Sequence, residues 1–91
     1  MTALRIVITG RVQGVGYRNW MCGQAEELGV SGWVRNRSDG TVEALVDGDP
    51  SAVQELLRAC RSGPRLATVT DITEHFADPP DAPGFVMRPT V

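Results

Sequence analysis

The 91-residue chain contains no lysine, a single histidine, His75, and only two cysteines, Cys22 and Cys60. One histidine and two separated cysteines are too few soft ligands for a zinc site, and neither cysteine belongs to a Cys-x-x-Cys motif. We therefore expect no zinc site. A disulfide between Cys22 and Cys60 is an open but unsupported alternative, because both residues fall in predicted helices and cytoplasmic thiols are usually reduced.

Long hydrophobic runs are also absent from the chain. No apolar segment approaches the roughly 20 residues that a membrane-spanning helix needs, and the N-terminal "MTALRIVIT" lacks the regions of a secretory signal peptide. We expect a cytoplasmic protein with no membrane partner. The length and the 42% hydrophobic content predict a single domain over residues 1–91, and the small size favours a monomer.

The charge is unevenly spread, although the net charge is only −2. Residues 1–37 carry five arginines against two glutamates, a charge of +3, whereas residues 38–91 carry four arginines against nine acidic residues, a charge of −5. A positive cluster on an acidic chain predicts a local anion site. A general nucleic-acid surface would need a basic domain, so we expect no nucleic-acid partner.

Alternating apolar residues predict the strands of the fold. The last long strand alternates irregularly, which is typical of a bulge. After a Pro-rich connection, a final short segment is expected to form an edge strand blunted by Pro89. The predicted strands cover residues 4–9, 30–36, 41–48, 67–76 and 84–88.

Helical spacing of apolar residues predicts two helices. The first runs from about Tyr17 to Leu28 and is ended by Gly29. The second has Asp49 as its cap and Pro50 at its first position, and it ends at residues 62–64. The order of elements is β-α-β-β-α-β with one extra strand, which predicts a ferredoxin-like α+β fold. We expect a mainly antiparallel sheet of four to five strands with both helices on one face.

The segment "GRVQGVGYR", residues 10–18, separates the first strand from the first helix. Because that helix crosses between the first and second strands, the two strands should run parallel and end at the same edge of the sheet. The second strand ends at Asn36. We therefore expect the glycine-rich segment, the helix N-terminus and Asn36 to meet.

These residues suit an anion that carries a reactive bond. Glycines allow close approach of the backbone, successive N–H groups form an anion nest, and the Arg18 guanidinium adds a planar set of donors. The segment matches neither G-x-G-x-x-G nor a Walker A loop, so nucleotide binding is not implied. The amide of Asn36 does not titrate, but it is able to orient a water molecule. Such positioning suffices for a carboxyl–phosphate anhydride, which is already reactive.

The two motifs "GRVQGVGYR" and "GWVRNRSDGTVEA" (32–44) resemble those of the acylphosphatase family in order and spacing. "GP" at 63–64 and the late "GFVMR" extend the resemblance over nearly the whole chain. The resemblance implies hydrolysis of a small-molecule acyl phosphate without a metal ion or a cofactor, with a carboxylate and inorganic phosphate as products.

The resemblance also implies roles for particular residues. Arg18 would bind the phosphate and Asn36 would position the attacking water, as the two catalytic residues. The substrate-binding residues would include Thr41, which matches a position that often carries a hydroxyl near the asparagine. The phosphate cradle would be formed by the backbone amides of Gln13, Gly14, Val15, Gly16 and Tyr17.

Two other functions are compatible with the sequence. Similar domains occur within larger enzymes that handle carbamoyl groups, so a non-catalytic anion-binding module is one alternative. An RNA-binding ferredoxin-like domain is another, although the first and third strands lack the aromatic residues that such a sheet displays. Arg35 and Arg37 are expected to be solvated charges that enrich the local field, and Tyr17, Trp20 and Trp33 are expected to pack.

Overall fold

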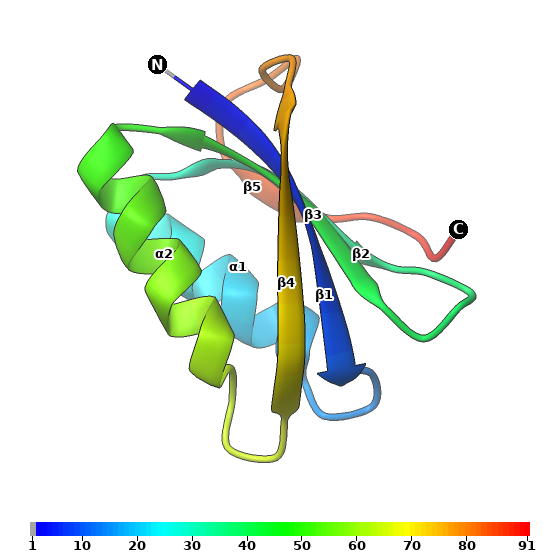
Figure 1. The fold of residues 1–91 in the computed structure, drawn as a ribbon. Coiled ribbons are helices and arrows are strands. Elements are labelled where there is room, and N and C mark those ends of the chain that lie inside the picture. The colour runs from blue at the N-terminus through cyan, green and yellow to red at the C-terminus, as the bar shows by residue number, and fades with distance from the viewer. Residues whose placement is uncertain (1) are drawn as a thin grey trace.

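The computed structural model describes residues 2–91 and contains two helices and five strands. Figure 1 shows both helices on one face of a twisted sheet whose strand order is β4-β1-β3-β2-β5. The β2–β5 pair is parallel, and the other three pairs are antiparallel. This architecture confirms the predicted ferredoxin-like α+β fold. The elements are β1 (Thr2–Arg11), α1 (Tyr17–Leu28), β2 (Ser31–Asn36), β3 (Val42–Gly48), α2 (Pro50–Ser62), β4 (Thr68–Ala77) and β5 (Phe85–Met87).

The helix ends follow from their capping residues. Gly29 ends α1 in the left-handed conformation, with φ 71°, and its N–H donates to carbonyls of the last turn. Asp49 stands at the cap position of α2, as predicted, but its side chain caps no backbone amide. Instead its carboxylate accepts a hydrogen bond from the Ser51 hydroxyl at 2.5 Å. The expectation of a side-chain cap is therefore wrong, because the Asp49 carboxylate binds the Ser51 hydroxyl and not a backbone amide.

The predicted bulge lies where β1 pairs with β4. Thr9 pairs with Asp71 and Gly10 pairs with Val69, so Thr70 is the extra residue. Gly10 has φ 131°, and a Cβ atom there would lie 2.1 Å from the carbonyl oxygen of Thr68. A glycine is thus required at the point where β1 leaves the regular sheet. The bulge also extends β1 beyond the predicted 4–9 range, up to the start of the glycine-rich loop.

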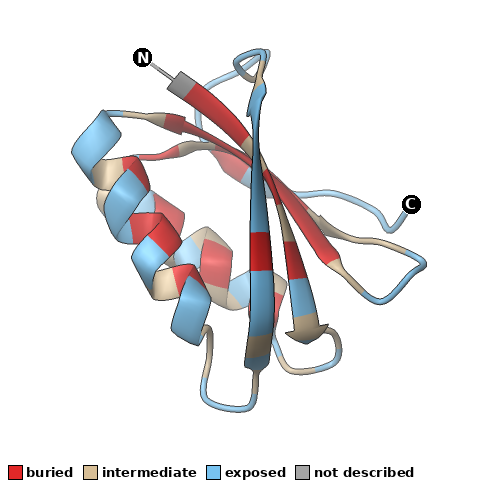
Figure 2. Cartoon of the chain, viewed as in Figure 1, coloured by how far each residue is buried: buried red, intermediate tan, exposed pale blue. Residues whose placement is uncertain are grey.

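The core lies between the sheet and the two helices, and Figure 2 shows buried positions on both helices and along the strands of the sheet. The opposite face of the sheet carries a smaller buried cluster around Trp33 and Leu45. Both cysteines are free, so the disulfide alternative is wrong. No helix of the described chain is long and apolar enough to cross a membrane. The main core includes Leu4, Ile6, Ile8, Met21, Ala25, Val34, Val42, Ala44, Val46, Val53, Leu56 and Cys60.

Candidate active site

A pocket of about 310 Å³ lies at the sheet edge where β1 and β2 end. β3 is antiparallel to both strands, so β1 and β2 run parallel, as predicted from the crossing helix. The structure therefore brings Arg18 and Asn36 to one pocket, although 17 residues lie between them in the sequence. The full lining is Val12, Gly14, Gly16, Tyr17, Arg18, Asn19, Asn36 and Met87.

The glycine-rich loop presents unpaired backbone donors to this pocket. Gly14 and Gly16 have φ of 72° and 78°, and the space where their Cβ atoms would stand is open. Within the described chain, the backbone N–H groups of residues 13–19 donate no hydrogen bond; the first to do so is that of Trp20, to the Gly16 carbonyl at 3.0 Å. Positive φ at alternate residues and a free helix N-terminus together form a nest for an anion.

Arg18 supplies a full positive charge beside this nest. It lies in the first turn of α1, is half-buried and lines the pocket. The first turn of α1 contains no acidic residue, and the ion pairs of residues 2–91 do not include Arg18. Its guanidinium is therefore free to bind an anion with two parallel N–H donors.

Asn36 lines the other side of the pocket. Its side-chain Oδ1 is buried and has no hydrogen-bond partner among the described residues. Its backbone is fixed by pairing with Val42 of β3 and by the Val91 N–H, which donates to the Asn36 carbonyl at 3.2 Å. An unpaired buried amide oxygen costs about 1–3 kcal/mol, so it is a strong acceptor for a water molecule or a ligand.

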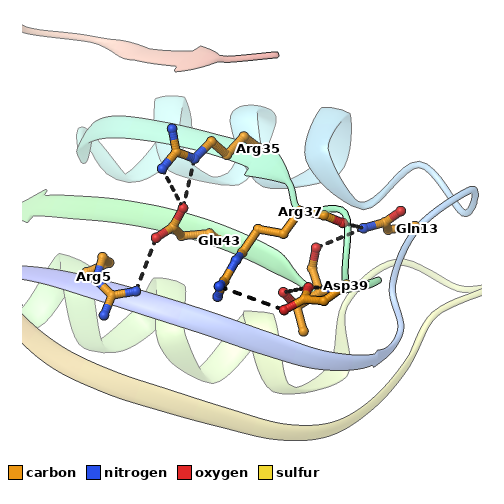
Figure 3. A network of polar contacts seen from close by, with 7 residues as sticks. Arg5, Gln13, Arg35, Arg37, Asp39 and Glu43 are labelled. Carbon is orange, nitrogen blue, oxygen red and sulfur yellow. Dashed lines mark hydrogen bonds and ion pairs between the residues drawn. The ribbon is translucent and has the colours of Figure 1, made fainter. Parts of the chain in front are cut away.

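Three of the predicted binding residues have side chains that do not line the pocket. The Gln13 side chain turns toward the β2–β3 hairpin, where its Nε2 donates to the carbonyls of Arg37 and Thr41 (Figure 3). The Thr41 hydroxyl donates to the Asp39 carboxylate at 2.6 Å. Val15 packs against the core. Gln13 and Val15 are not among the residues that line the pocket, so the part played by their backbone amides stays a prediction, and the Thr41 hydroxyl is already engaged by Asp39.

Tyr17 lines the floor of the pocket and belongs to the core, as expected for a packing residue. It is 1% exposed, and its hydroxyl donates to the Cys60 carbonyl at 2.7 Å. Burial raises the pKa of Tyr17 far above its usual value, so the phenol stays protonated. The contact joins the start of α1 to the end of α2 and thereby fixes the helix that carries Arg18.

Sequence reasoning did not propose Val12, Asn19 or Met87 as pocket residues. Val12 is 1% exposed and serves as an apolar floor, whereas Met87 is 42% exposed at the pocket wall. The parallel β2–β5 pairing places Met87 opposite Val34, two residues before Asn36. The late motif "GFVMR" was the sequence feature that could have pointed to Met87. Its proximity to Asn36, however, depends on a strand register that the sequence does not specify.

Arg35 is not a solvated charge, contrary to expectation. Figure 3 shows Arg35 and Arg5 reaching Glu43 from two sides. The Arg35 and Arg5 guanidinium groups lie 2.7 Å and 3.1 Å from the Glu43 carboxylate, and Arg35 also stacks 4.5 Å from the Trp33 ring centre. Burial acts to raise the pKa of Glu43, but the hydrogen bonds and charges of the two arginines outweigh it and lower the pKa. Arg35 is thus held in an ion pair on the face opposite the helices.

Arg37 is the second hairpin arginine that was expected to be solvated. Its guanidinium lies 3.8 Å from the Asp39 carboxylate, and both side chains are more than a third exposed. A pair this long and this exposed is screened by water and holds its partners weakly. Arg18 is therefore the arginine that lines the pocket, since Arg35 pairs with Glu43 elsewhere and Arg37 lies in the hairpin.

Free backbone amides, an arginine and an asparagine at one pocket of this α+β fold form a candidate site for a phosphate-type anion. The family model described as Acylphosphatase matches residues 4–87. An acylphosphatase of Acidiphilium cryptum is 63% identical over 90 residues, covering 99% of both chains, and one of Rhodospirillum rubrum is 50% identical over the full length of both. The crystal structure of acylphosphatase from Bacillus subtilis superimposes with a TM-score of 0.90 at 36% identity, covering 97% of this chain and 99% of that one. This chain belongs to the acylphosphatase family.

Proposed function

We propose that this protein is an acylphosphatase, which hydrolyses the carboxyl–phosphate bond of acyl phosphates to a carboxylate and inorganic phosphate. Family membership over residues 4–87 supports this activity. The observation that carries the proposal is the buried, unpartnered Oδ1 of Asn36 in the same pocket as the free loop amides and Arg18. An anion site alone needs no such acceptor, whereas a hydrolase has to hold a water molecule beside the bound phosphate.

In the proposed mechanism, the loop amides and Arg18 bind the phosphoryl oxygens and stabilise the charge that develops on them. Asn36 Oδ1 accepts a hydrogen bond from a water molecule and directs its oxygen toward phosphorus. The water oxygen–phosphorus bond forms while the bond from phosphorus to the acyl oxygen breaks, and the electron pair leaves with the carboxylate.

The proton of the attacking water passes to the substrate phosphate. The pocket-lining residues of the described chain include no Asp, Glu or His that would serve as a base. Tyr17, which does line the pocket, stays protonated and directs its hydroxyl to the Cys60 carbonyl. Catalysis therefore rests on positioning and charge stabilisation, which is sufficient for an activated anhydride.

We also propose the wider context of this activity. Residues 1–91 form one acylphosphatase domain that acts as a cytoplasmic monomer, with a small-molecule acyl phosphate as its partner and no nucleic acid or membrane. Family matching over residues 4–87 supports the single domain. The acidic composition, with a net charge of −2, supports the absence of a nucleic-acid partner.

The test is hydrolysis of benzoyl phosphate and acetyl phosphate in the presence of EDTA, with inorganic phosphate as a competitive inhibitor. Loss of a charge-stabilising donor costs about 100-fold or more in turnover, so we expect Arg18→Ala to lose at least that much kcat and to weaken phosphate inhibition. Asn36→Ala should lose turnover while the inhibition constant of phosphate changes little.

Two results would count against the proposal. Full activity of both variants would show that neither Arg18 nor Asn36 takes part in the reaction. Phosphate binding by the wild type without hydrolysis of either substrate would instead favour a non-catalytic anion-binding module. The Arg58→Ala variant is the matched control, because Arg58 lies on the exposed face of α2 and pairs only with Glu55 among the described residues.

A further inference from the structure

Gln13 joins the glycine-rich loop to the hairpin that follows Asn36. Its Nε2 donates to the Arg37 carbonyl at 2.8 Å and to the Thr41 carbonyl at 2.9 Å (Figure 3). These two carbonyls belong to opposite arms of the β2–β3 hairpin, where the Arg37 N–H also donates to the Thr41 carbonyl at 2.9 Å. One amide group therefore contacts both arms at once.

No other hydrogen bond of the described chain connects residues 12–16 with residues 37–41. The loop is otherwise held by its ends, the β1 strand and the α1 helix, and by Val15, which packs against the core. Gly14 and Gly16 make its backbone easy to displace, because they have no side chains and no neighbouring atom lies within 4 Å of the position that a Cβ atom would occupy. The Gln13 side chain is thus the hydrogen-bonded link between the loop and the hairpin beside Asn36.

We propose that Gln13 is a positioning residue that sets the phosphate-binding loop in register with Asn36. This inference rests on the proposed acyl phosphate hydrolysis, because it concerns the geometry of the same reaction. The Gln13 side chain does not line the pocket and touches no reacting atom. It acts through the loop on one side and through the residue next to Asn36 on the other.

The chemistry of the side chain suits this role. A primary amide supplies two N–H donors without charge, one for each carbonyl. A glutamate at this position would direct acceptors at two carbonyl oxygens, and a methionine of similar length would offer no donor. Displacement of a reacting group by about 1 Å costs up to about 100-fold in rate, so a link between the two halves of the site has kinetic consequences.

The test compares Gln13→Met with the matched control Gln54→Met, which changes an exposed glutamine on α2. We expect Gln13→Met to lower kcat for benzoyl phosphate by about 10-fold or more while the inhibition constant of phosphate stays within about threefold. The control should keep wild-type values. Gln13→Asn, which retains the amide but is one methylene shorter, should recover part of the lost kcat.

A double variant separates positioning from simple loss of structure. If Gln13 acts through Asn36, then Gln13→Met should change kcat by less than about twofold when Asn36→Ala is already present. An equal loss in both backgrounds would overturn the proposal, as would an unchanged kcat in Gln13→Met. If Gln13→Met does not fold, as judged by circular dichroism, Gln13→Asn takes its place in the same cycle.

The outcome also distinguishes this inference from the proposed function. A wild-type protein without hydrolysis would overturn both statements. If the wild type is active and Gln13→Met keeps the wild-type kcat, the positioning role alone is overturned.

Discussion

Glu43 is held between two arginines on the sheet face opposite the helices, and replacing it by glutamine should destabilise the protein by about 2 kcal/mol at pH 7. The Glu43 side chain is 9% exposed, whereas those of Arg35 and Arg5 are 26% and 38% exposed. Breaking a fully buried ion pair costs about 3–5 kcal/mol, and a solvent-exposed pair contributes about 0–1 kcal/mol. The Glu43 network lies between these limits, because one partner is buried and the other two still contact water.

The effect should depend on pH with a defined sign. The arginines lower the pKa of Glu43 below its ordinary value of 4.5, so the unfolded chain binds the proton more readily than the folded protein. The contribution is fully present above the unfolded pKa and is lost as the pH falls through the folded pKa. The difference between wild type and Glu43→Gln should therefore be largest near neutral pH and should shrink below about pH 4.5.

Urea unfolding followed by tryptophan fluorescence measures this difference, and Trp33 lies directly against Arg35. The free energy of unfolding of both proteins is compared at several pH values between 3 and 7. A difference below about 0.5 kcal/mol at pH 7 would place the network among exposed pairs and refute the argument. A difference of the same size at every pH would show that the carboxylate charge is not its cause.

Three further outcomes follow from the packing. Gly32→Ala should lower the free energy of unfolding, measured in urea, by about 3 kcal/mol or more. The reason is that Gly32 has φ 140° and its Cβ atom would lie 1.8 Å from the Leu45 carbonyl oxygen. A loss under about 1 kcal/mol would contradict this. Tyr17→Phe should lower the free energy of unfolding by about 1 kcal/mol, since the bond to Cys60 is lost; an unchanged free energy of unfolding would contradict this. Cys60 is 0% exposed, and burial raises its pKa to about 11, so an aromatic disulfide reagent at pH 8 should modify it only after urea unfolding; rapid reaction in the native state would contradict its burial.

The sequence predicted the elements and their order because periodicity and turn residues report on local structure. Helix α1 has the predicted bounds, and the parallel course of β1 and β2 followed from the crossing helix. That topology was sufficient to place Arg18 and Asn36 at one pocket.

Side-chain partners across strands were not predictable in the same way. Glu43 meets Arg35 and Arg5 because β3 lies between β2 and β1 in a particular register, which residue spacing within one strand does not reveal. The same reason explains why Gln13 was assigned to the pocket by its backbone while its side chain binds the hairpin. Contacts that depend on two distant segments require the assembled sheet.

In the proposed mechanism, a water molecule oriented by Asn36 attacks phosphorus while the loop amides and Arg18 hold the phosphoryl group. Hydrolysis of benzoyl phosphate in water enriched in the heavy oxygen isotope, with mass spectrometry of both products after a single turnover, shows which atom the water attacks. We expect the heavy oxygen in inorganic phosphate and none in benzoate. Heavy oxygen in benzoate would mean that water attacks the carbonyl carbon, which contradicts the assignment of the loop and Asn36 to the reacting phosphorus.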